Sequence, residues 1–253
     1  MRAGDDVRVF PDLGLLGEAA AGALTQILAE LTQDRSPAEG PIELAVAGGF
    51  VATDVLSRVD AAPAPGGDHA GRPRPAWDRV RVWWADERYV PASDPDRNDT
   101  SAFDALFTRT AGVDLRPMPV DDGTRALSEA GRTYRDEWTR EMSGRRLDLA
   151  VLGMGPDGHV ASLFPGRATL DAAEPVLVEP DSPKPPPPRI TLSRGVLTGA
   201  RRIWVVAGGG AKADALARAF APGADFHEVP AAALRGPRTT WWLDRDAAAR
   251  LPG

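Results

Sequence analysis

The chain has 253 residues, 43% of them hydrophobic and 26% charged, which is the composition of an ordinary globular protein with a substantial core. It contains no cysteine, which excludes a disulfide framework, a thiolate nucleophile and a cysteine-ligated metal. The net charge of −6 argues against nucleic acid as a partner, because phosphate backbones attract basic surfaces, but a few converging cations can still bind a small anion.

The sequence also indicates a protein without a membrane partner. No apolar run approaches the roughly 20 residues that a helix needs to cross a bilayer. The N-terminal stretch MRAGDDVRVF has acidic residues where a secretory signal carries basic ones, and it lacks the apolar segment of such a signal. We therefore expect a cytoplasmic protein.

The first sixty residues predict two strands, each followed by a helix. Residues 7–10 form a short strand, and Asp12 is placed to cap the helix that follows. Apolar residues recur in that helix at steps of three and four, which predicts one apolar stripe. The stripe consists of Leu13, Leu16, Ala20, Leu24, Ile27 and Leu31. Residues 42–47 predict a buried strand, and Gly48-Gly49 leads from it into a helix over about residues 50–59.

The middle of the chain continues this alternation after a long loop. Residues 61–76 contain prolines and glycines without periodicity, so we expect a loop in which His69 is solvated. Residues 80–85 predict the next buried strand. Helical stretches are expected near residues 101–110 and over residues 124–142.

Residues 147–166, LDLAVLGMGPDGHVASLFPG, are the most informative stretch. They predict a buried strand over residues 147–153, then a glycine-rich turn that presents Asp157 and His159, then a short helix. Of the three histidines, only His159 follows a strand directly, and in an open α/β sheet the crevice beyond a strand's carboxyl end holds the chemistry. His159 is therefore a candidate general acid or base. The alternative is a core histidine within a glycine-rich turn.

The next part of the chain begins with a proline run. Residues 183–188 hold five prolines in six positions, which predicts an extended polyproline segment before a short strand over residues 189–192. Residues 202–207 predict another strand. Gly208-Gly209-Gly210 then leads into a helix that contains Lys212.

A last strand over residues 240–244 completes a series of strand-then-helix units. Uninterrupted apolar strands in such units predict an α/β fold with a mostly parallel sheet covered on both faces. Neither side of the proline-rich stretches has a self-sufficient set of strands, so we expect residues 1–253 to form a single domain.

Besides the histidine, three groups of residues are candidates for binding an anion. Gly48-Gly49 stands where a helix N-terminus offers free N–H groups to a phosphate, although a tight turn without a ligand is an equal alternative. Asp86 and Arg88 point to the same side if the third strand extends, either to contact a ligand or to form a surface ion pair. Arg189 and Lys212 are ordinary solvated cations taken singly, but both stand beside strand ends.

Two kinds of site lack support. The histidines are far apart in the sequence, so no familiar spacing of metal ligands is present. The chain has no GxSxG motif for a serine nucleophile. Ser162, three residues after His159, is more simply explained as a serine on the following helix.

Taken together, these segments resemble the 6-phosphogluconolactonase family along almost the whole chain. The matching blocks are VAGG (46–49), WADERYVP (84–91), DRN (96–98), LGMGPDGH (152–159), LFPG (163–166), PPRITL (187–192), GAKADAL (210–216) and, more weakly, WLD (242–244). The second, fourth and fifth blocks are the most specific.

The resemblance implies a three-layer αβα Rossmann-like fold, shared with amino-sugar phosphate isomerases. It also implies hydrolysis of 6-phospho-D-glucono-1,5-lactone to 6-phosphogluconate in the oxidative pentose phosphate pathway, with a phosphorylated sugar lactone as the partner and no cofactor. By position, His159 would activate water, and Asp86 and Arg88 would flank the substrate. The groups implied to hold phosphate are Arg189, Lys212 and the Gly48 and Gly49 amides.

Three positions need comment beside this resemblance. Asp157 either orients the imidazole of His159 or caps the following helix. The family usually has Ser or Thr after the second glycine, whereas this chain has Phe50, so a hydroxyl donor is lost unless Thr53 or another group replaces it. The family's serine in a C-terminal Pro-Ala-Ser segment is replaced here by Ala232.

Two other functions are the alternatives. A glucosamine-6-phosphate isomerase/deaminase would share the fold, but those enzymes carry a carboxylate shortly after the histidine, and residues 163–165 contain no acid. A non-catalytic sugar-phosphate-binding protein would not need a base, so the presence of Asp86, Arg88 and His159 together favours turnover.

Overall fold

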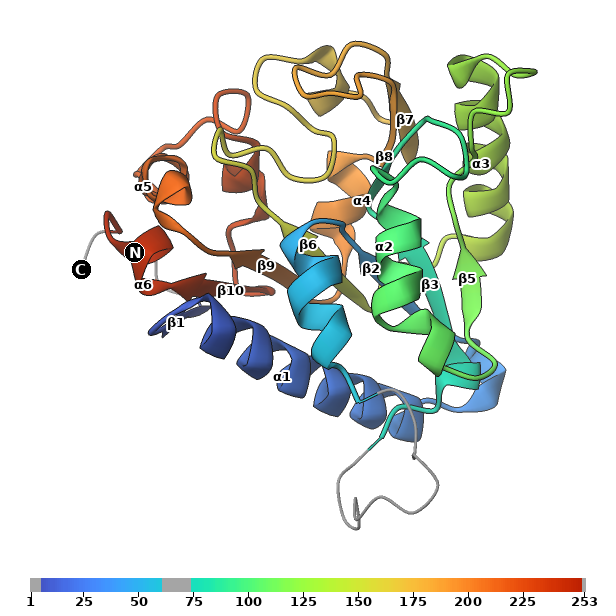
Figure 1. Cartoon of the computed structure of the whole chain (residues 1–253), viewed down its shortest axis with the longest axis horizontal. Helices are drawn as coiled ribbons and strands as arrows, with labels where there is room; N and C mark the ends of the chain where they lie inside the picture. Colours follow the sequence, from blue (N-terminus) through green and yellow to red (C-terminus); the bar gives the residue numbers. More distant parts are fainter. Residues whose placement is uncertain (1–5, 61–73, 252–253) are drawn as a thin grey trace.

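The computed structural model describes residues 6–60 and 74–251, which form an α/β fold around two sheets (Figure 1). In the larger sheet seven strands pair in parallel throughout. Their order across the sheet is β1 (Asp6–Phe10), β10 (Thr239–Asp244), β9 (Ile203–Ala207), β6 (Leu149–Gly153), β2 (Ile42–Val46), β3 (Val80–Trp84) and β5 (Asp114–Arg116). The predicted mostly parallel sheet is confirmed.

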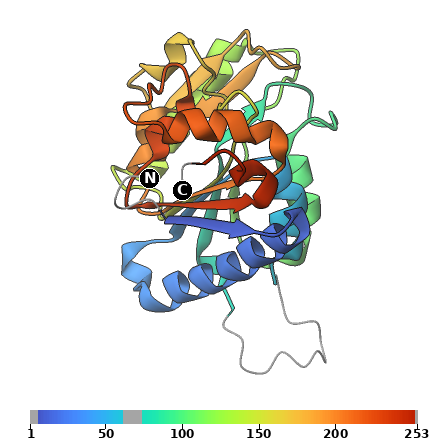
Figure 2. The ribbon, with the colours of Figure 1, turned by 90° about the vertical axis from the view of Figure 1, so that its left-hand side faces the viewer.

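Helices cover this sheet on both faces. They are α1 (Leu13–Asp34), α2 (Asn98–Ala105), α3 (Leu127–Met142), α4 (Arg194–Gly199), α5 (Ala213–Phe220) and α6 (Arg245–Ala248). Figure 2 shows the edge formed by β1 and β10 between α1 on one side and α5 on the other. Asp12 caps α1, its carboxylate accepting the N–H of Leu15, as predicted. Within residues 6–60 and 74–251, no helix combines the length and the apolar character needed to span a bilayer.

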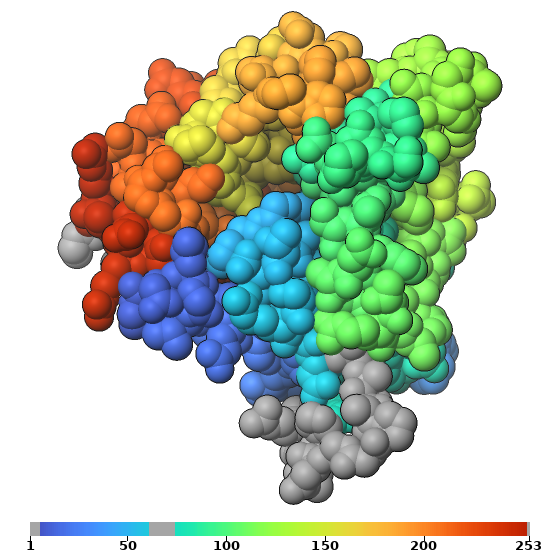
Figure 3. All heavy atoms as spheres, in the orientation of Figure 1, coloured from blue at the N-terminus to red at the C-terminus, as the bar shows by residue number. Residues whose placement is uncertain are grey.

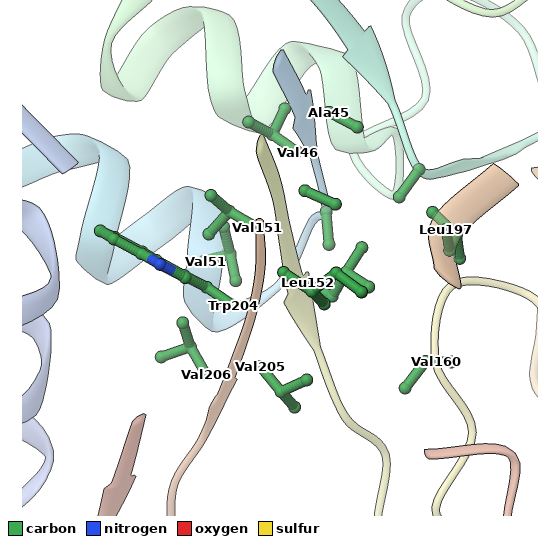
Figure 4. Packing of buried hydrophobic residues seen from close by; sticks show 14 of the residues in the cluster. Ala45, Val46, Val51, Val151, Leu152, Val160, Leu197, Trp204, Val205 and Val206 are labelled. Carbon is green, nitrogen blue, oxygen red and sulfur yellow. The ribbon is translucent and has the colours of Figure 1, made fainter. Parts of the chain in front are cut away.

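The centre of the sheet is apolar on both sides. Every residue of β2 and β9 is buried, and successive residues of β6 and β9 face opposite layers. Figure 4 shows Val151 beside Val51 and Trp204 on one side of the sheet, whereas Leu152 points to the other side, toward the part of the core that contains Leu197. The uninterrupted apolar strands therefore result from burial on two faces rather than one.

The order of the strands creates a topological switch point. Within the larger sheet, the strand that follows β2 in the chain is β3 on one side, whereas the strand that follows the adjacent β6 is β9 on the other side. The connections that leave two neighbouring strands in opposite directions open a crevice at their carboxyl ends. Gly48-Gly49 follows β2, and the turn with His159 follows β6, so both lie at this crevice.

A smaller antiparallel sheet was not predicted. Its strands are β4 (Asp86–Arg88), β8 (Arg189–Leu192) and β7 (Val176–Glu179), in that order. β4 follows β3 after a bend at Ala85 rather than extending it. The register places Arg88 opposite Arg189, which brings two of the predicted site residues together.

Other predictions need correction. The segment expected as a helix over residues 50–59 is irregular, with a π-helical turn at Val51–Val55 and a 3₁₀ turn at Leu56–Arg58. The short helix expected after His159 is wrong, because Ala161 has a left-handed φ of 49° and Val160 pairs with Leu163 instead. The proline run bends over residues 183–186 rather than staying extended. Most of the loop predicted over residues 61–76, with His69, lies outside the described residues.

At the edge where the parallel strands begin, opposite to the crevice, a buried carboxylate holds neighbouring elements together. Asp148, directly before β6, is 1% exposed and accepts hydrogen bonds from Arg35 and, at 2.9 Å, from the backbone N–H of Glu43 in β2. The guanidinium of Arg201 lies 3.4 Å away. Asp148 thus ties α1 and β2 to the start of β6.

We predict that Asp148→Ala lowers the free energy of unfolding by about 3 kcal/mol, because it leaves buried donors and the Arg35 guanidinium without their acceptor. Urea unfolding measures this change. The matched control is Asp181→Ala, which removes a carboxylate that is 84% exposed beside Arg167 and should change the free energy by less than about 0.5 kcal/mol. Equal effects of the two substitutions would contradict the prediction.

Candidate active site

A pocket of about 490 Å³ opens at the switch point. In the space-filling view the surface is hollowed between the light-blue, yellow and orange parts of the chain, which include residues near 50, 160 and 210 (Figure 3). The predicted site residues that line it are Gly48, Gly49, Asp86, Arg88, His159, Arg189 and Lys212. Asp157 is not part of the lining but lies against the ring of His159.

The imidazole of His159 is fixed by Asp157. Its Nδ1 lies 2.5 Å from Asp157 Oδ1, and since a carboxylate only accepts hydrogen bonds, Nδ1 is the donor of the proton in this contact. When Nδ1 carries that proton, the neutral ring keeps its lone pair on Nε2. Among the described residues Nε2 has no hydrogen-bond partner, and it is not buried, so it is accessible from the pocket.

The same contact decides between the two roles considered for Asp157. No helix follows the turn, so Asp157 caps none. Burial alone raises the pKa of Asp157, but the hydrogen bond and charge of His159 and the charge of Lys184 together hold it well below its usual range. The carboxylate is therefore ionised near neutral pH and available to accept the Nδ1 proton.

The glycine-rich turn helps to fix the position of the His159 imidazole. A Cβ atom on Gly155 would lie 1.9 Å from Cε1 and 2.0 Å from Nδ1 of His159, so only glycine lets the backbone pass this close. On another side the ring packs against Phe164, with 4.7 Å between the ring centroids. The imidazole thus lies between the turn and an aromatic side chain.

Asp86 and Arg88 are held by side chains from other segments. Asp86 is 8% exposed, and its Oδ2 accepts a hydrogen bond of 2.6 Å from Ser162 Oγ. Ser162 is therefore a partner of Asp86 and not the helix-facing serine that was expected. Arg88 Nη1 donates to the side-chain oxygen of Asn98, whose amide nitrogen donates to the Asp86 carbonyl at 2.9 Å.

Glu87, between these two residues, points the other way and anchors them. Its buried carboxylate accepts backbone N–H groups of Arg88, Asn98 and Asp99, each at 2.8 Å, and lies 3.8 Å from the Arg97 guanidinium. Burial raises the pKa of Glu87 to about 7, against the lowering effects of the Asn98 N–H and of Arg97. This carboxylate joins β4 to the start of α2.

Two further cations reach the pocket from different elements. Arg189 is 4% exposed, and its Nε and Nη2 donate to backbone carbonyls of the proline segment, which leaves Nη1 accessible. The side-chain ammonium of Lys212 has no hydrogen bond or ion pair with the described residues. Burial and, second, the charge of Lys184 lower the pKa of Lys212. A cation placed in this way gains from an incoming anion.

The turn after β2 offers backbone donors. Among the described residues, the N–H groups of Gly48 and Gly49 donate to no acceptor. A Cβ atom on Gly48 would lie 1.8 Å from Asn98 Oδ1, so glycine allows the turn to approach α2. Phe50 lines the pocket, whereas the Thr53 hydroxyl donates to Asp54 at 2.7 Å and is not part of the lining. Thr53 therefore does not replace the missing hydroxyl.

The structure adds residues that the sequence analysis did not select. Lys184 lines the pocket, and its Nζ lies 3.3 Å from His159 Nδ1. Asn98 also lines it. A lysine inside a proline run was the only signal for the first, and the second had a signal as the last residue of the DRN block (96–98). Within residues 6–60 and 74–251, no group of three or more His, Asp or Glu side chains is arranged to hold a metal ion.

We predict that Gly155→Ala displaces the imidazole of His159, because the added methyl group overlaps the ring. The imidazole proton resonances of His159, assigned by their loss in His159→Ala, should move, since the Phe164 ring lies so close. Gly153→Ala is the control, because a Cβ atom there meets nothing within 4 Å. Unchanged His159 resonances in Gly155→Ala would contradict this geometry.

Comparisons with known proteins agree with this architecture. Residues 16–242 match the family model described as glucosamine-6-phosphate isomerases/6-phosphogluconolactonase. The chain is 35% identical to a 6-phosphogluconolactonase of Streptomyces coelicolor, over 96% of this chain and 94% of the relative. It is 41% identical to a 6-phosphogluconolactonase of Mycobacterium tuberculosis, over 70% of this chain and 75% of the relative.

Solved structures show the same fold. The 6-phosphogluconolactonase from Trypanosoma cruzi superposes with a TM-score of 0.79 at 22% identity, covering 100% of this chain and 99% of the other. The enzyme of the same name from Trypanosoma brucei gives a TM-score of 0.76 at 24% identity, covering 98% and 99%. With the fold, the family model and curated relatives in agreement, the chain belongs to the 6-phosphogluconolactonase family.

Proposed function

We propose that this protein hydrolyses 6-phospho-D-glucono-1,5-lactone to 6-phospho-D-gluconate, a step of the oxidative pentose phosphate pathway. The names of its relatives support this reaction. The observation that carries the proposal is the accessible Nε2 of His159 in the same pocket as the Lys212 ammonium and the Gly48 and Gly49 amides. A soluble sugar phosphate as substrate also fits the predicted cytoplasmic location.

Water is the nucleophile in this proposal. Nε2 of His159 accepts a proton from water as the water oxygen bonds to C1 of the lactone, and Asp157 stabilises the imidazolium that forms. The tetrahedral intermediate then breaks the bond from C1 to the ring oxygen, which takes the proton from Nε2. The carboxylic acid that forms at C1 releases its proton to the solvent, so the net reaction consumes one water and yields the carboxylate, and the histidine returns to its neutral form.

The developing negative charge on the carbonyl oxygen needs a nearby donor. The guanidinium of Arg88 lines the same pocket, with its Nη1 held by Asn98 and by the Asp96 carbonyl, so it needs little reorganisation. Asp86, fixed by Ser162, supplies an acceptor for a sugar hydroxyl. We assign these two residues to the sugar end of the substrate.

The phosphate is assigned to the other group of donors. The Lys212 ammonium makes no ion pair with the described residues, and the free amides of Gly48 and Gly49 line the same pocket. Arg189 adds its accessible Nη1. Backbone N–H groups and cations together are the usual means by which proteins bind phosphate, and they make dispensable the hydroxyl donor that Phe50 replaces.

The first test compares lactone hydrolysis by wild-type protein and His159→Ala, with freshly generated substrate and correction for spontaneous opening. We expect the wild type to exceed the background clearly and the variant to lose about 10²–10⁴-fold in kcat, the usual contribution of a general base. A wild-type rate equal to the background would refute the function. Full activity in the variant would refute only the role of His159.

The second test separates the two ends of the pocket. Lys212→Met should raise KM for the phosphorylated lactone by roughly 10- to 100-fold, the effect of losing one charged hydrogen bond, and should leave KM for unphosphorylated gluconolactone nearly unchanged. Steady-state kinetics on both substrates measures this difference. Similar changes in KM for both lactones would mean that Lys212 does not bind the phosphate.

A further inference from the structure

Lys184 is a pocket cation that the reaction scheme above does not use. It stands in the bent proline segment before β8, and its Nζ lies 3.4 Å from Asp157 Oδ1 and 3.3 Å from His159 Nδ1. Because Nδ1 already donates its proton to Asp157, the ammonium can donate only to the carboxylate. Asp157 is therefore shared between the imidazole and Lys184.

The backbone around Lys184 is held firmly. Arg189 Nε donates to the Pro186 carbonyl at 2.7 Å, and its Nη2 donates to the carbonyls of Lys184 and Pro185 at 3.1 Å. Ser182 Oγ accepts the N–H of Lys184 at 3.2 Å. Since Arg189 is buried, water competes little for these bonds, and the lysine stem starts from a fixed point facing the pocket.

The charges around the imidazole are unequal in number. The cations are Lys184, Lys212, Arg88 and Arg189, and the anions are Asp157 and Asp86. A proton on His159 would add another positive charge to a pocket that already has more cations than anions. Like charge within about 4–6 Å disfavours the charged form of a titrating group, and Lys184 is the cation whose contact with the imidazole is closest in the structure.

We propose that Lys184 is a positioning residue that keeps His159 in its neutral, proton-accepting form. Asp157 alone would favour the imidazolium, and the ammonium of Lys184 offsets that effect without breaking the hydrogen bond that orients the ring. The pH range in which Nε2 can accept a proton from water therefore extends further into the acid. The catalytic part of this inference rests on the proposed function, whereas the electrostatic part does not.

The direct test is an NMR titration of the imidazole of His159 in ligand-free protein, with the signal assigned by its loss in His159→Ala. In Lys184→Met we expect the midpoint of the titration to rise by about one pH unit relative to wild type. Lys184→Arg keeps the charge and should stay within about 0.3 unit of wild type. A rise below about 0.3 unit in Lys184→Met would overturn the proposal.

The matched control is Lys212→Met, which removes a cation from the same pocket that makes no hydrogen bond to Asp157 or His159. Its midpoint should rise by less than half as much as that of Lys184→Met. An equal rise of the midpoint in both variants would mean that the total charge of the pocket acts on the imidazole of His159, rather than the position of Lys184. That result would contradict the inference.

Kinetics supply a second readout. The acid limb of the kcat/KM profile should move upward with the NMR midpoint in Lys184→Met, so that the rate near pH 6 falls by up to about tenfold. A raised KM at every pH with an unmoved acid limb would make Lys184 a substrate ligand and overturn the proposal. If the wild type shows no lactone hydrolysis, the proposed function fails, while the NMR titration still decides the role of Lys184.

Discussion

The common direction of the seven strands is the constraint on which the rest of this structure depends. Because every pair in the larger sheet is parallel, all strand ends of one kind lie along one edge. Each connection must then return across a face, and where β2 and β6 send theirs in opposite directions the edge opens. Segments that are far apart in the sequence, 48–50, 153–164 and 206–212, come together there around one pocket.

Within that pocket, one set of contacts fixes the imidazole of His159, and a second set of groups gives the remaining volume its positive charge. The Asp157 carboxylate and the Phe164 ring fix the imidazole of His159, and Nε2 stays free for chemistry. Cations and backbone amides surround the remaining volume and are only partly neutralised by the protein. The small antiparallel sheet brings Arg88 of β4 beside Arg189 of β8, because its register pairs these two residues. The unneutralised charge would destabilise the empty protein, and under the proposed function a phosphorylated ligand would balance it.

Much of this arrangement could be predicted from sequence because it depends on local pattern. Apolar runs located the strands of the main sheet except β5, which has only three residues, and the rule that chemistry follows strand ends selected His159 and Gly48-Gly49. The small sheet could not be predicted, since β4 pairs with β8 from a distant part of the chain, and both β4 and β7 are too short to have a clear period. The helix expected after His159 does not form, because the left-handed Ala161 turns the chain back.

The partners of the site residues were hidden from the sequence for the same reason. Ser162 meets Asp86, and Lys184 meets Asp157, only after both sheets have formed. No spacing along the chain encodes such contacts. By contrast, the contact between Asp157 and His159 joins residues two positions apart, and the sequence analysis considered it.

The central claim is that one pocket holds the reacting carbon at His159 and the phosphate at Lys212, and a crystal structure with bound 6-phospho-D-gluconate tests it most directly. We expect the product's carboxylate within hydrogen-bond distance of His159 Nε2 and its phosphate on Lys212 Nζ and the Gly48 and Gly49 amides. A product bound in the reverse orientation, or outside this pocket, would contradict the claim.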